Sequence, residues 1–235
     1  MQKLTHLNIG AIVFPEVDQA DFTGPFEILS RIPDATFHVL WKELTPVRDV
    51  RGLIITPEKR LEEAPALDLL VVPGGSGQEA LMDDEVILRF IQAQAENVQY
   101  VLSVCTGALL CGAAGLLRGV RATTHWSARH LLEYFGAIPE DARVVVDGKI
   151  VTAAGVTAGL DGALRVAALL CGEAVAQQIQ LSIEYAPEPP FHGGTPGTAP
   201  PEVLSAARAS VEAITDARLR TAKRFAVRLG ITRNA

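Results

Sequence analysis

Residues 101–109 read Val-Leu-Ser-Val-Cys-Thr-Gly-Ala-Leu, and this stretch decides the fold. A run of β-forming residues ends directly in Cys105, and a helix of small residues begins at once. The pattern predicts a nucleophile elbow, a sharp strand-to-helix turn that strains its central residue and in which Gly107 relieves crowding. The helix dipole should then lower the pKa of the Cys105 thiol. The alternative is a buried thiol of the core.

Short apolar runs on both sides of the elbow predict a parallel sheet. Strands are expected at Leu7–Phe14, Thr36–Trp41, Gly52–Thr56, Leu67–Val72 and Val98–Val104. A helical pattern around Glu85–Ala95 precedes the last of them. Apolar strands alternating with helices are typical of α/β proteins in which helices cover both faces of the sheet.

The next part of the chain carries a hairpin and two helices. Arg143–Ala153 has Asp147-Gly148 between two β-rich runs, which predicts a hairpin with a tight turn. Thr157–Cys171 and Glu173–Ile183 predict helices, the first of them rich in Ala, Leu and Val and therefore buried.

The end of the chain predicts a separate helix. Residues 187–201 are rich in Pro and Gly and form a wrap or a linker, and Glu202–Leu229 is helical. An apolar stripe follows this helix at Leu204, Ala207, Val211 and Ile214, and then shifts to Leu219, Ala222, Phe225 and Leu229. We therefore predict a domain at 1–201 and a helical extension at 202–235 that packs on this domain or on a second subunit.

Composition excludes several classes of protein. The 235 residues carry a net charge of -6, and a nucleic-acid partner would demand a basic surface instead. No signal peptide and no apolar run of ~18 residues is present, so we expect no membrane span. The three cysteines, Cys105, Cys111 and Cys171, are an odd number without framework spacing, which favours a reduced, cytoplasmic protein. Cys111 and Cys171 lie in helical patterns and are interpreted as structural.

Two further signals follow strands. Residues 73–77 (PGGSG) form a Gly-rich turn whose backbone N–H groups, Gly75 among them, suit an oxyanion. Asp21 lies among apolar neighbours after the first strand, where an apolar pocket would keep its carboxyl group protonated and able to act as a general acid. Because the carboxyl ends of parallel strands converge, Asp21, Gly75 and Cys105 can meet. The alternative for Asp21 or Asp18 is a cap of the helix that begins near Thr23.

His125 ends another short β-rich run, 20 residues after Cys105. It is either the general base of a Cys–His pair or a polar residue that bonds to the backbone at a strand end. The five histidines show no spacing typical of metal ligands, so no metal site is predicted.

These features together resemble the DJ-1/PfpI superfamily. Longer strings are similar to bacterial isonitrile hydratases, at residues 15–29 (PEVDQADFTGPFEIL), 103–126 (SVCTGALLCGAAGLLRGVRATTHW), 153–164 (AAGVTAGLDGAL) and 183–191 (IEYAPEPPF). The resemblance runs from about Leu7 to Pro201. One departure is Ala153-Ala154, where many relatives have Gly-Gly.

The resemblance implies a flavodoxin-like three-layer α/β sandwich, a homodimer, and hydration of isonitriles to N-substituted formamides without a cofactor. It places the nucleophile on Cys105, the partnering carboxyl group on Asp21 and a required neighbour on Thr106. Relatives named as proteases or deglycases usually have His directly after the cysteine. Thr106 at that position argues against such a Cys-His elbow. Backbone N–H groups near Gly75 and Thr106 would hold developing charge.

Two other functions remain open. The Cys-Thr-Gly and Thr-Thr-His-Trp strings also occur in amidase-like, ligand-sensing domains of AraC-type transcription regulators. Those proteins add a helix-turn-helix module of ~100 residues, whereas the part after Pro201 reads as one helix. The third possibility is a redox sensor that works by oxidation of Cys105.

Overall fold

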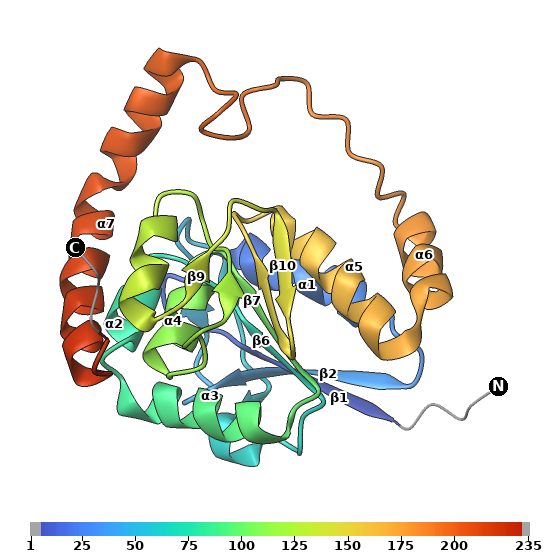
Figure 1. Ribbon diagram of the computed structural model, residues 1–235. Helices are drawn as coiled ribbons and strands as arrows, with labels where there is room; N and C mark the ends of the chain where they lie inside the picture. The colour runs from blue at the N-terminus through green and yellow to red at the C-terminus, as the bar shows by residue number, and fades with distance from the viewer. Residues whose placement is uncertain (1–5, 232–235) are drawn as a thin grey trace.

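The computed structural model describes residues 6–231 and shows a three-layer α/β fold around a seven-stranded sheet (Figure 1). The strand order is β10-β11-β7-β6-β1-β2-β5, and every neighbouring pair is parallel except β10 and β11. The strands are β1 (Leu7–Ile12), β2 (Ala35–Trp41), β5 (Lys59–Arg60), β6 (Leu69–Val72), β7 (Tyr100–Val104), β10 (Val144–Asp147) and β11 (Ile150–Ala153). The predicted mostly parallel sheet and the predicted hairpin are confirmed.

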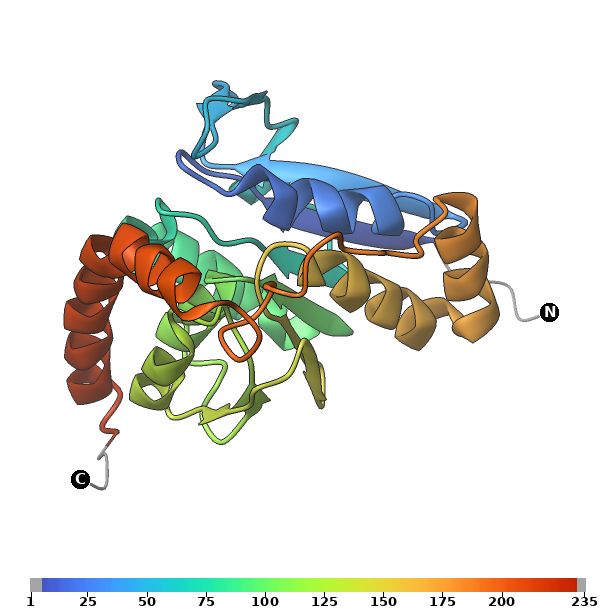
Figure 2. The same cartoon turned by 90° about the horizontal axis from the view of Figure 1, so that it is seen from above.

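Helices cover both faces of this sheet (Figures 1 and 2). α1 (Gln19–Leu29) and α5 (Ala158–Cys171) pack on each other over one face, and α3 (Glu85–Asn97) and α4 (Gly107–Ala113) cover the other. The remaining helices before the tail are α2 (Gln78–Leu81), α6 (Glu173–Ser182) and the 3₁₀ helices η1 (Leu61–Glu63) and η2 (Arg129–Phe135). None of the helices that the structure describes is long and apolar enough to cross a membrane.

The three central strands bring the predicted site together. β1, β6 and β7 are neighbours, and β6 is buried along its whole length, as expected for a strand covered on both faces. Because they are parallel, their carboxyl ends open at the same edge of the sheet. The segments that follow them carry Asp21, Gly75 and Cys105.

One predicted strand lies outside the sheet. Gly52–Thr56 contributes only β4 (Ile54–Ile55), which pairs antiparallel with β3 (Val47–Arg48). The Asp49 carboxylate accepts hydrogen bonds from the backbone N–H groups of Arg51 and Leu53, at 2.8 and 2.7 Å, and so closes this hairpin. The prediction of a sheet strand from this apolar run is wrong, because its residues Leu53 and Ile54 are not buried but 52% and 54% exposed. A second minor pair, β8 (Arg121–Ala122) with β9 (Ile138–Pro139), is parallel.

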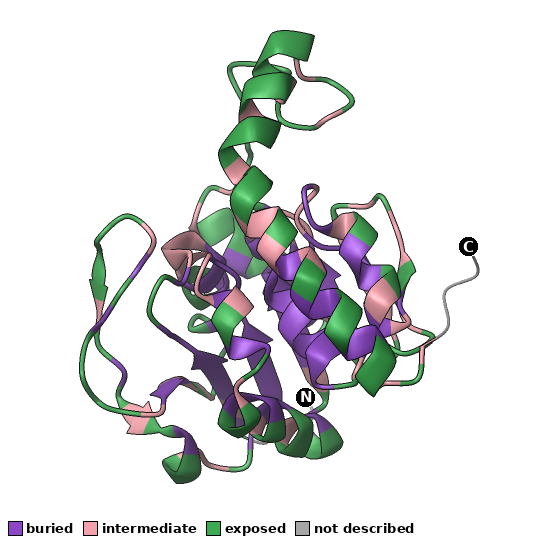
Figure 3. Ribbon diagram, turned by 90° about the vertical axis from the view of Figure 1, so that its left-hand side faces the viewer, coloured by how far each residue is buried: buried purple, intermediate pink, exposed green. Residues whose placement is uncertain are grey.

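The predicted tail helix is α7 (Pro201–Arg228), and its two halves differ in burial (Figure 3). The second half packs against η2 and α2 and buries Ala222 and Phe225. The first half extends away from the body of the molecule, and there Leu204 and Ala207 are only partly covered. The extension thus packs on its own domain over half of its length. Residues 1–5 and 232–235, which include the end of the predicted extension, lie outside the described part.

Candidate active site

The elbow has the strained geometry that the sequence predicts. Cys105 follows β7 with a φ of 55°, a conformation that L-residues other than glycine rarely adopt. Its N–H donates to the carbonyl groups of Ala153 and Ala154, at 3.0 and 2.8 Å, so the neighbouring strand end fixes the turn. A Cβ on Gly107 would lie 2.0 Å from the Val72 carbonyl oxygen, so only glycine fits where α4 begins. Cys105 as a whole residue is 7% exposed.

Asp21 lies inside α1, fully buried. Its Oδ2 accepts a hydrogen bond from the Gly74 N–H at 3.0 Å, whereas Oδ1 is buried without a partner of normal geometry among the described residues. The helix is capped instead by Asp18, which accepts from the Ala20 N–H at 3.1 Å. The capping alternative therefore applies to Asp18 and not to Asp21.

Thr106 connects the elbow to the Gly-rich turn. Its Oγ1 accepts a hydrogen bond from the Gly75 N–H at 3.3 Å, and both residues border the Cys105 thiol. A Cβ on Gly74 would lie 2.6 Å from the Thr106 nitrogen and 2.9 Å from Asp21 Oδ2, so this turn can approach the pair only as glycine. The structure thus brings Asp21, Gly75, Cys105 and Thr106 together. The oxyanion role of Gly75 stays a prediction, since its N–H already serves Thr106.

Burial dominates the protonation of the central pair. It raises the pKa of Asp21 to about 8, and the charge on Asp18 adds to the effect. Burial also raises the pKa of the Cys105 thiol, and a charge on Asp21 raises it further. The backbone N–H groups of Thr106 and Val156 oppose this rise. The prediction of a lowered thiol pKa is wrong, because removing a thiolate from water costs more than the short helix returns. Both groups hold their protons at neutral pH.

Comparison with known proteins then establishes the relationship. The DJ-1/PfpI family profile matches residues 8–169, well over half of the chain. The chain belongs to the DJ-1/PfpI family. A protein named isonitrile hydratase from Pseudomonas putida is 48% identical over 225 residues, which cover 96% of this chain and 99% of that protein.

Other relatives define how far the likeness extends. The crystal structure of a family protein from Pseudomonas syringae superimposes with a TM-score of 0.91 at 39% identity, over 93% of this chain and 91% of that one. The transcriptional regulator GbdR of Pseudomonas aeruginosa is 35% identical over 112 residues, which cover 47% of this chain and 30% of the regulator. The regulator match thus concerns about half of this chain and under a third of the regulator. In this chain one helix, α7, occupies residues 201–228.

His125 borders the same pocket as Cys105 in this DJ-1/PfpI chain. Its Nδ1 lies 2.8 Å from the Ser127 hydroxyl oxygen and also accepts from the Ser127 N–H at 3.4 Å. Burial, aided by the charge of Arg218, lowers the pKa of His125 to about 4. The imidazole is therefore neutral at physiological pH and a weak base, which favours the structural alternative.

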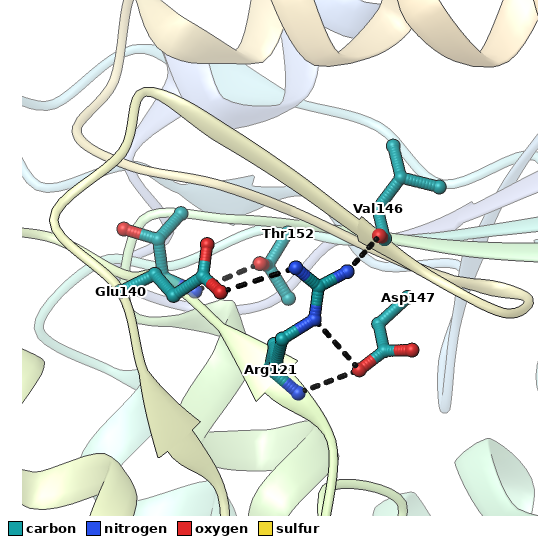
Figure 4. Close-up of polar contacts among 6 residues, drawn as sticks. Arg121, Glu140, Val146, Asp147 and Thr152 are labelled. Atoms are coloured by element: carbon teal, nitrogen blue, oxygen red, sulfur yellow. Dashed lines mark hydrogen bonds and ion pairs between the residues drawn. The ribbon is translucent and has the colours of Figure 1, made fainter.

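A polar network anchors the segment that carries His125 (Figure 4). The Arg121 side chain donates to Glu140 at 3.3 Å and to the Val146 carbonyl at 3.3 Å, and the Arg121 backbone N–H donates to the Asp147 carboxylate at 2.8 Å. Three residues further along the chain, the Thr124 hydroxyl donates to the Cys105 carbonyl at 2.6 Å. The β10–β11 hairpin therefore holds both this segment and the elbow.

An open pocket of about 340 Å³ lies over the thiol. The sequence identified Gly75, Cys105, Thr106 and His125 among the residues that line it, but missed Val156, Val211, Ile214 and Arg218. Val156 has a φ of 29° and directs its N–H at the Cys105 sulfur. Nothing in its local pattern reveals this strain. The other three come from α7, so the extension forms one wall of the pocket.

The other two cysteines are remote from this chemistry. Cys111 is fully buried in α4, where burial raises its pKa to about 12 and keeps the thiol inert. Cys171 ends α5 and is partly buried, and neither thiol borders the pocket. No group of His, Cys, Asp and Glu within residues 6–231 has the arrangement of a metal site.

Proposed function

We propose that the protein hydrates isonitriles to N-substituted formamides, with Cys105 as nucleophile and Asp21 as proton donor and acceptor. The observation that carries the substrate class is the 48% identity to the isonitrile hydratase of Pseudomonas putida over nearly the whole of both chains. The chemistry is supported by the strained Cys105 against a buried carboxyl group whose pKa is raised to about 8. The proposed site needs no cofactor or metal.

The first step is the addition of the thiol across the isonitrile carbon. Asp21 gives its proton to this carbon, which becomes electrophilic, and the Cys105 sulfur attacks it. The thiol proton passes to Asp21, so the carboxyl group is protonated again. The product is a thioimidate, R–N=CH–S–Cys105, and no net charge has entered the buried site.

The second step is hydration at the same carbon. Asp21 delivers its proton to the imine nitrogen while water adds to the carbon and returns a proton to the carboxylate. The tetrahedral adduct then collapses to the formamide, and its hydroxyl proton and the expelled sulfur restore the Cys105 thiol. The N–H groups of Thr106 and Val156, which face the sulfur, stabilise charge that develops on it.

A direct assay tests the function. Purified protein is mixed with a simple alkyl or aryl isonitrile, and infrared and mass spectra follow the loss of the N≡C stretch and the gain of ~18 mass units that one added water requires. Absence of turnover, together with reversible oxidation of Cys105 during a peroxide titration, would replace the hydratase by a redox sensor.

Activity should decline at alkaline pH. Because the raised pKa of about 8 keeps Asp21 protonated below that pH, kcat/KM should be constant near pH 7 and fall about tenfold per unit above pH ~8. Stopped-flow or steady-state rates between pH 6 and 10 check this. A kcat/KM that rises between pH ~7 and ~9 would instead indicate that the thiolate is the reacting form and that Asp21 is not the acid.

The wall formed by α7 should set substrate size. Val211 and Ile214 present aliphatic side chains to the pocket and would contact the organic group of the isonitrile. Ile214→Ala should raise KM for an aryl isonitrile about tenfold with little change in kcat, because it removes binding common to ground and transition states. Methyl isonitrile should be affected less. Val203→Ala, on the exposed part of the same helix, is the matched control. Equal effects of both variants would contradict this role.

The protein is further proposed to be a cytoplasmic homodimer that binds neither nucleic acid nor membranes. The cysteines are all free, which suits a reducing compartment. The partly covered apolar residues on the first half of α7, Leu204 and Ala207, offer a surface for a second copy. Light scattering during gel filtration measures the mass of the particle, and a monomer at micromolar concentration would reject the dimer.

A further inference from the structure

A cationic side chain from the tail reaches the active site. Arg218 lies in the second half of α7 and is only 5% exposed. It borders the pocket together with Cys105 and Thr106, although it lies outside residues 8–169 that match the family. An arginine so deeply buried is uncommon, because its desolvation is costly unless its donors and its charge are satisfied.

The guanidinium group of Arg218 binds the Gly75–Thr106 corner, where the Gly-rich turn contacts the residue after Cys105. Nη2 donates to the Gly75 carbonyl at 2.7 Å and to Thr106 Oγ1 at 3.4 Å. Nε donates to Gln78 Oε1 at 3.0 Å, which fixes the plane of the group. One side chain therefore connects the Gly-rich turn, the residue after the nucleophile and the start of α2.

All these acceptors are neutral, so hydrogen bonding does not neutralise the charge. Within the described residues no carboxylate lies close enough to Arg218 to form an ion pair. The acidic groups that it faces are Cys105, Asp21 and Glu79, and Glu79 already accepts a hydrogen bond from Thr221 at 2.7 Å. The buried positive charge thus faces the Cys105–Asp21 pair.

Other charged groups also surround this pair. Asp18 at the start of α1 opposes ionisation of Asp21, His125 is neutral, and Arg51 borders the open side of the pocket. Asp18 acts against an anion, and the Arg51 side chain reaches solvent, where its charge is screened. Among these groups around the Cys105–Asp21 pair, Arg218 is the buried cation.

We propose that Arg218, supplied by the C-terminal helix, is a positioning residue that fixes the Gly75–Thr106 corner and stabilises negative charge on the Cys105–Asp21 pair. The inference rests on the proposed function only in taking Cys105 as the reacting group. When Asp21 gives up its proton, or when Cys105 leaves the adduct as a thiolate, the resulting anion lies near the positive charge of Arg218. The extension thereby completes a site whose other parts belong to the family domain.

The pH profile of Cys105 alkylation tests the charge. Iodoacetamide modification is followed by mass spectrometry of the Cys105 peptide, which separates it from Cys171. Arg218→Met should shift the pH profile of the Cys105 alkylation rate ~1 unit towards alkaline pH. At a fixed pH on the rising limb, the rate should then be about tenfold lower than that of the wild type. Arg224→Met is the matched control, because Arg224 lies on the same helix, is exposed and pairs with Asp83. Its profile should coincide with that of the wild type. Coincident profiles for a folded Arg218→Met protein would overturn the proposal.

Arg218→Lys separates charge from geometry. It keeps the cation but cannot reproduce the fork that bonds Gly75 and Gln78 together. Its alkylation profile should stay near that of the wild type, while kcat falls about tenfold at nearly constant KM. Wild-type kcat in Arg218→Lys would overturn the positioning role even if Arg218→Met does not fold. Alkylation needs no isonitrile, so a protein without isonitrile turnover would reject the proposed function and still give a result for Arg218.

Discussion

The Cys105→Ser variant is expected to lose isonitrile turnover by at least ~10⁴-fold and to remain folded. A serine hydroxyl is a far weaker nucleophile than a thiol, and the neutral His125 offers it no strong base. Serine has nearly the size of cysteine and can adopt the same backbone, so the elbow at φ 55° should persist. Steady-state rates and thermal denaturation, measured on the same preparation, check both halves of this prediction.

Cys111→Ala is the control for this result. Cys111 lies about one turn into α4, fully buried and outside the pocket, so its loss should lower stability slightly and leave kcat unchanged. Full activity in Cys105→Ser combined with inactivity in Cys111→Ala would transfer the nucleophile to Cys111 in α4.

The sequence predicts the fold around the site well because its signals there are local. A β-rich run that ends in Cys-Thr-Gly forces a tight turn, and the structure shows why: any side chain at Gly107 would collide with the Val72 carbonyl. The small strands are harder to predict. The Leu53 and Ile54 side chains resemble a buried strand in sequence, but they belong to a short hairpin whose turn is closed by hydrogen bonds to the Asp49 carboxylate.

The site is predicted less completely, for two physical reasons. The pKa of a thiol depends on its burial, which depends on segments far along the chain, so the helix dipole alone gave the wrong direction for Cys105. Counted by apolar residues alone, the stripe of α7 also shifts to another face of the helix after Ile214. The buried face in fact continues through Arg218, four residues on, towards Ala222 and Phe225. A charged residue in the middle of an apolar stripe was the signal that could have indicated its role.

Asp21→Asn should lose at least ~100-fold in turnover, the lower range for general acid catalysis. An amide has no acidic proton at neutral pH, so it can neither protonate the isonitrile carbon nor accept the thiol proton. The amide oxygen can still accept the hydrogen bond from the Gly74 N–H. Asp21→Glu should be intermediate, because it keeps the acid and displaces it by one methylene group. Steady-state rates on both variants test this.

Stability should respond to Asp21→Asn in the opposite direction. Folding raises the pKa of Asp21 from 3.8 to about 8, so the folded wild type keeps a proton that the unfolded chain loses above pH ~4. This costs the wild type roughly 1 kcal/mol of unfolding free energy per pH unit up to pH ~8, and asparagine avoids the cost. The Tm of Asp21→Asn should therefore rise relative to the wild type between pH ~5 and ~8. An active Asp21→Asn enzyme with a parallel Tm profile would make Asp21 a structural residue and leave Cys105 without a proton donor.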